Sequence, residues 1–88
     1  MLRILSLILI AFSVSPYAKA QSALLESVKR NPEEARFLCK QFKDLNSQGV
    51  SISSEKALSE FAKQQKLSRI DAEILSIYVI GITCPDVY

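Results

Sequence analysis

The fold depends on residues 68–85, SRIDAEILSIYVIGITCP. Ser68 is a favoured helix N-cap, and Asp71 follows three residues later in the capping-box position. The segment is then apolar nearly all round, as in a helix buried on most faces. Its β-branched residues at 77–83 would also suit a strand, but the helix-forming residues 72–75 lead directly into them and no partner strand is visible. We therefore predict a central helix that ends at Cys84-Pro85.

Three helices are predicted before this segment. The first runs from Ser22 to Arg30, and Asn31-Pro32 then starts the second, because asparagine caps helices and proline fits their first position. Gly49 ends the second helix, and the serines at 53–54 start the third. Apolar residues at three- and four-residue spacing define the buried faces, which are Ala35, Leu38, Cys39, Phe42 and Leu45 in the second helix and Ala57, Leu58, Phe61 and Ala62 in the third.

The chain has two cysteines, Cys39 and Cys84, and no histidine. Zinc sites and cysteine nucleophiles normally use histidine, and a redox motif would place two cysteines close together. A structural disulfide between Cys39 and Cys84 is therefore predicted. It would close a loop of roughly 46 residues, which contributes about 4 kcal/mol in the chain-entropy treatment.

The first twenty residues have the pattern of a secretory signal peptide. Arg3 supplies the positive start, residues 4–12 form the apolar stretch, and Ala18 and Ala20 frame a small-x-small cleavage site. An uncleaved membrane anchor is the alternative, although a span needs about 20 apolar residues. We expect a periplasmic or extracellular protein that meets the membrane only through its signal peptide, during export.

Cleavage changes the charge of the protein. The whole chain has 11 Lys plus Arg against 9 Asp plus Glu, and Arg3 and Lys19 leave with the signal. The remaining chain is formally neutral and has no basic patch with interleaved aromatic residues, so no nucleic-acid partner is expected. Residues 1–20 are thus assigned to the signal peptide and 21–88 to a single small helical domain. The predicted fold class is all-α: a three- to four-helix disulfide-stapled bundle preceded by a cleavable signal helix.

Catalytic, cofactor and metal-binding groups are not expected. The acid pairs Glu33 with Glu34 and Asp71 with Glu73 fall in first helical turns, where the helix dipole stabilises carboxylates. A non-enzymatic interaction or structural protein is the preferred function, with an unknown protein partner possible. A stress-responsive periplasmic chaperone and a carrier of small apolar ligands are the alternatives. We expect a contact patch on the last helix, formed by Ile77, Val79, Ile80 and Ile82. Residues 87–88 are expected to form a loose tail.

Several short motifs resemble those of one family of small exported proteins. They are a cysteine on a core helix at Cys39, the turn Gly49-Val50, the helix start Leu-Ser-x-x-Asp-Ala at 67–72, and the closing Cys84-Pro85. Over residues 35–86 the chain is similar to the secreted helical proteins of the domain-of-unknown-function 732 family. The resemblance implies an exported helical domain without an assigned chemistry.

Overall fold

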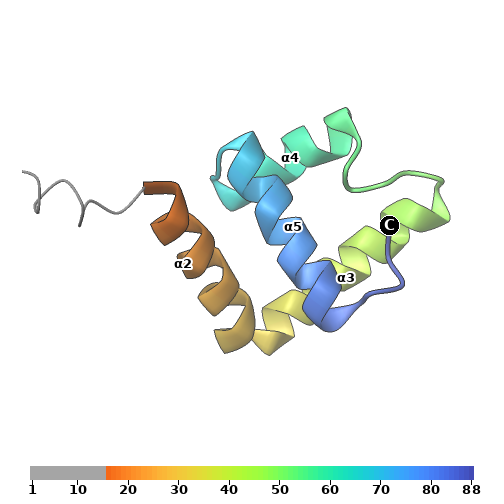
Figure 1. The fold of residues 1–88 in the computed structure, drawn as a ribbon. Coiled ribbons are helices and arrows are strands. Elements are labelled where there is room, and N and C mark those ends of the chain that lie inside the picture. Colours follow the sequence, from red (N-terminus) through yellow and green to blue (C-terminus); the bar gives the residue numbers. More distant parts are fainter. Residues whose placement is uncertain (1–15) are drawn as a thin grey trace, which may run out of the picture.

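The computed structural model describes residues 16–88, with side chains from Ala23 onward. In this part of the chain the regular structure is helical, with α2 at Pro16–Arg30, α3 at Pro32–Ser47, α4 at Glu55–Gln65 and α5 at Arg69–Thr83 (Figure 1). Residues 1–15 of the predicted signal peptide lie outside the described residues, as do the side chains of Ala18 and Ala20. None of the helices within 16–88 combines the length and the hydropathy that a membrane crossing requires.

Helix α5 is the centre of the bundle. It contacts α2, α3 and α4, and Figure 1 shows it running between them. Ala72 and Val79 are completely buried, and Leu75 is buried between them. At its start, the backbone N–H of Asp71 donates to Ser68 Oγ at 3.1 Å. The prediction of a central helix is confirmed, because residues 77–83 continue α5 and form no strand.

The junction between α2 and α3 differs from the prediction. Helix α2 begins at Pro16 instead of Ser22, and Asn31 does not cap α3 with its side chain. Asn31 Nδ2 instead donates backwards to the carbonyl oxygen of Ser27 at 3.0 Å, so it closes the end of α2. The residue before a proline is kept out of the helical region, and Asn31 accordingly has φ −124° and ψ 67°. Asn31 is therefore the N-cap residue of α3 by position, as predicted, but the expected cap by its side chain is absent.

The turns around α4 follow local backbone rules. Gly49 adopts φ +77°, and the Val50 N–H donates to the Leu45 carbonyl at 2.9 Å, which ends α3 as predicted. Ser54 is the N-cap residue of α4 but makes no side-chain cap bond. Lys66 ends α4 in the left-handed conformation with φ 57°.

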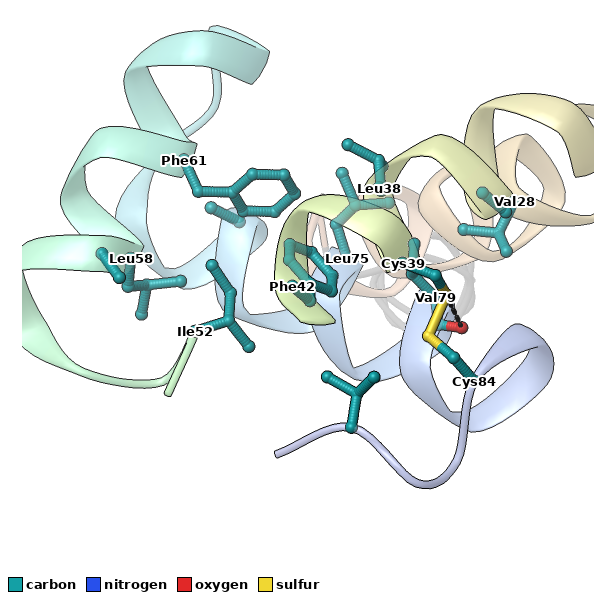
Figure 2. Close-up of a cluster of buried hydrophobic side chains, with 14 of the residues drawn as sticks. Val28, Leu38, Cys39, Phe42, Ile52, Leu58, Phe61, Leu75, Val79 and Cys84 are labelled. Carbon is teal, nitrogen blue, oxygen red and sulfur yellow. Dashed lines mark hydrogen bonds between the residues drawn. A yellow bond between two sulfur atoms is a disulfide. The ribbon is translucent and has the colours of Figure 1, made fainter. Parts of the chain in front are cut away.

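A single apolar core joins the four helices and the connector between α3 and α4 (Figure 2). Phe42 and Phe61 meet edge to face, with their ring centroids 5.3 Å apart. Leu58 and Ile52 are buried on the α4 side, and Val28 brings α2 into the same cluster. Together with the disulfide, this core holds the four helices in place.

Candidate functional site

The two cysteines predicted to pair do form a disulfide, which joins the middle of α3 to the end of α5 (Figure 2). Both side chains are buried, and the Cα atoms of Cys39 and Cys84 are 6.1 Å apart, within the usual range. Cys39 Sγ lies 3.9 Å from the Val79 carbonyl oxygen. An oxidised sulfur carries no hydrogen, so this is a packing contact. The disulfide is buried in the core and shielded from solvent, as is typical of a structural disulfide.

The segment after the disulfide is anchored, so the expectation of a loose tail was wrong. Val87 is buried in the core cluster. The Tyr88 N–H donates to Asn46 Oδ1 at 2.9 Å, and Asn46 Nδ2 donates to the Tyr88 main-chain oxygen at 2.6 Å. The same amide nitrogen also reaches the Val50 carbonyl at 2.9 Å, so one side chain ties both the α3–α4 connector and the C-terminal residues.

One side of α5 is apolar and faces outward. Ile70 and Ile77 are 56% and 58% exposed, Ile74 between them is half-buried, and Gly81 is exposed one turn further on. Their spacing of three or four residues puts all four on one side of the helix, opposite Val79. We call these residues the outer face of α5. Ile82 lies on the same last turn and is 52% exposed.

Part of the predicted contact patch is therefore corrected. Val79 is fully buried because it points into the core, and Ile80 is half-buried against the core. Ile77 and Ile82 are exposed as expected. Ile70 was missed, although its position seven residues before Ile77 was the available signal. Phe37, on the solvent side of α3, was also missed and is 56% exposed.

The acid pairs do not converge on one another. Glu33 and Glu34 are exposed in the first turn of α3, whereas Asp71 and Glu73 lie at the start of α5. Among the described residues, no three acids, cysteines or histidines are grouped so that they could hold a metal ion. Glu33, Glu34 and Asp71 lie in first helical turns, where the helix dipole stabilises carboxylates.

The fold and its surface define a small all-helical domain, closed by one disulfide, with an apolar face on its central helix. A family model described as a domain of unknown function (DUF8664) matches residues 25–84. The match covers most of the chain, and the chain belongs to this family. The resemblance to the domain-of-unknown-function 732 family was wrong: its motifs, a helix cap, a glycine turn and a Cys-Pro end, are general features of small helical domains. No curated protein and no solved structure matches the chain.

Proposed function

We propose that this chain is a non-catalytic interaction domain that works in the periplasm or outside the cell after removal of residues 1–20. The outer face of α5 carries the proposal. A surface-exposed isoleucine is ordinary by itself, but Ile70 and Ile77 extend along one helix face with Ile74 between them. The opposite face of α5 already packs into the core. The domain therefore does not need apolar side chains on the outer face in order to fold.

The rest of the surface supports a docking role more than a chemical one. The polar residue Arg69, which precedes Ile70, is held by an ion pair with Glu55 on α4. Gly81 has no side chain at the far end of the face, and the space above it is open, because a Cβ built there would meet no atom within 4 Å. An apolar strip with a polar border is the usual composition of a protein contact. The buried disulfide joins α5 to α3 and so holds this face in position, and such a bond persists in an oxidising compartment.

Site-specific photo-crosslinking in the native host tests the proposal. A photoreactive amino acid at position 70 should give one discrete protein adduct, and one at the exposed position Lys43 on α3 should not. Ile77→Asp should reduce the adduct formed from position 70 by about tenfold or more, because a charge would be buried at the contact. Ile77 is exposed, so the variant should remain folded.

The outcomes separate the alternatives. One adduct that forms from position 70 and is lost in Ile77→Asp supports a dedicated partner. A broad ladder of adducts that grows under stress would favour the chaperone interpretation and contradict this proposal. Equal adducts from positions 70 and 43, or none from position 70, would also contradict it.

A further inference from the structure

A groove of about 280 Å³ separates α3 from α4 on a side of the molecule that α5 does not line. Its apolar floor consists of Phe42, Ile52, Ala57 and Phe61, all buried, with Leu45 half-buried beside them. The two phenylalanine rings that meet edge to face hold α3 and α4 together beneath it. This volume is close to the lower end of small-molecule sites, so the groove suits a molecule with one ring or a short alkyl chain.

The border of the groove is polar and acidic. Gln64 Nε2 donates to Gln41 Oε1 at 3.2 Å, which links the two helices. Asp44 on α3 and Glu60 on α4 contribute one carboxylate from each wall. No lysine or arginine lines the groove, although residues 23–88 contain equal numbers of basic and acidic residues.

Both carboxylates are available to a ligand. Across the part of the chain that the structure describes, the ion pair found is the one between Arg69 and Glu55, and neither Asp44 nor Glu60 makes one, although Lys40 and Lys56 lie one helical turn away from them. Two like charges at the edge of one small apolar groove raise the local negative potential. A bound cation would relieve it, whereas an anion would be repelled by both walls.

We propose that the α3–α4 groove binds a small organic cation, an amine or guanidinium attached to an aryl or short alkyl body. The body would lie against the half-buried Leu45 and the exposed edges of the apolar floor, and the charged end would lie between Asp44 and Glu60. The site is separate from the outer face of α5, because no α5 residue lines the groove. The domain would thus bind a small ligand in this groove and its proposed protein partner on the outer face of α5.

Three probes with the same phenyl body test the charge requirement. The oxidised, exported protein labelled with ¹⁵N is titrated with phenethylamine, with the neutral phenethyl alcohol and with the anion 3-phenylpropanoate, and amide shifts are followed by NMR. Phenethylamine should shift amides of residues 41–45, 52 and 57–64, with a dissociation constant in the millimolar range. The alcohol should bind about threefold to tenfold more weakly, since exposed carboxylates contribute modestly, and the anion should bind more weakly still.

Matched variants identify the carboxylates. Asp44→Asn with Glu60→Gln keeps both shapes and should bring phenethylamine down to the affinity of the alcohol. Glu26→Gln with Glu73→Gln removes the same charge from exposed positions outside the groove and should leave the affinity unchanged. Equal affinity for amine and alcohol in the unaltered protein, shifts centred on other residues, equal losses in both double variants, or no shift at tens of millimolar amine would each overturn the proposal.

Discussion

The amide of Asn46 forms a reciprocal pair of hydrogen bonds with the backbone of Tyr88, 42 residues further along the chain. The Tyr88 hydroxyl also approaches the Asn46 carbonyl oxygen, at 3.4 Å. This contact holds the residues after Cys84 against the end of α3, so that Val87 enters the core. The end of α5 is thus fixed to α3 twice, by a covalent bond at Cys39 and by the amide of Asn46.

Replacing the amide should release the C-terminal residues. Asn46→Ala removes the bonds to Tyr88 and to the Val50 carbonyl, and we expect a loss of about 1–2 kcal/mol in the free energy of unfolding. Urea denaturation measures the loss, and NMR order parameters of residues 86–88 should fall. Asn31→Ala is the control, because its exposed amide makes one local bond to Ser27 and should cost less. Equal losses in the two variants would contradict the special role of Asn46.

The disulfide should supply much of the stability of this small domain. Cys39 and Cys84 are 45 residues apart in sequence, and closing a loop of that length is worth about 4 kcal/mol. Reduction with dithiothreitol should therefore lower the urea midpoint of the wild-type protein strongly. A Cys39→Ala/Cys84→Ala variant should have the same urea midpoint with and without dithiothreitol. An unchanged wild-type midpoint after complete reduction would rule out this contribution.

Two phenylalanines on α3 provide a direct test of the core. Phe42 is 1% exposed and packs against Phe61, whereas Phe37 is 56% exposed. Phe42→Ala should cost about 3–5 kcal/mol, because it leaves a cavity in the cluster. The same change at Phe37 should alter the free energy of unfolding by about 0.5 kcal/mol or less. Similar costs at both positions, measured by urea denaturation, would show that α3 packs with another face.

Two serine caps differ in their contacts. Ser68 Oγ accepts the Asp71 N–H, but the side chain of Ser54 makes no cap bond. Ser68→Ala should therefore destabilise the protein by about 1 kcal/mol, and Ser54→Ala by less. Thermal unfolding of both variants under the same buffer gives the comparison. A larger loss of stability in Ser54→Ala than in Ser68→Ala would contradict the cap contacts described for the two helix starts.

Helix positions and most of the core could be predicted from the sequence because they depend on local spacing. The stripe containing Leu38, Cys39 and Phe42 has a helical period, and its members are buried. Asn31 is the N-cap residue of α3, as predicted, but its side chain makes no cap bond. A preference for N-caps says nothing about a competing acceptor, and the Asn31 amide donates to the Ser27 carbonyl on the preceding helix. The anchoring of Tyr88 depends on a residue 42 positions away, which local patterns do not reveal.

The candidate sites show the same division. An excess of apolar residues on α5 predicted an outward patch, but with Val79 in it, because a helix that is apolar nearly all round does not indicate which side meets the core. The contacts with α2, α3 and α4 decide this, and they bury Val79 while leaving Ile77 exposed. The sequence suggested a carrier of small apolar ligands as an alternative function, but it did not locate a groove between α3 and α4. Its acidic border depends on two helices placing Asp44 and Glu60 at the same opening.

Intact-mass spectrometry of the protein collected from the periplasm or the culture medium tests the central claim, an exported domain closed by one disulfide. We predict a chain that begins at Gln21 and is two hydrogens lighter than its dithiol form, with the difference removed by reduction. A protein that retains Met1, or one that leaves the cell with free thiols at Cys39 and Cys84, would contradict the account.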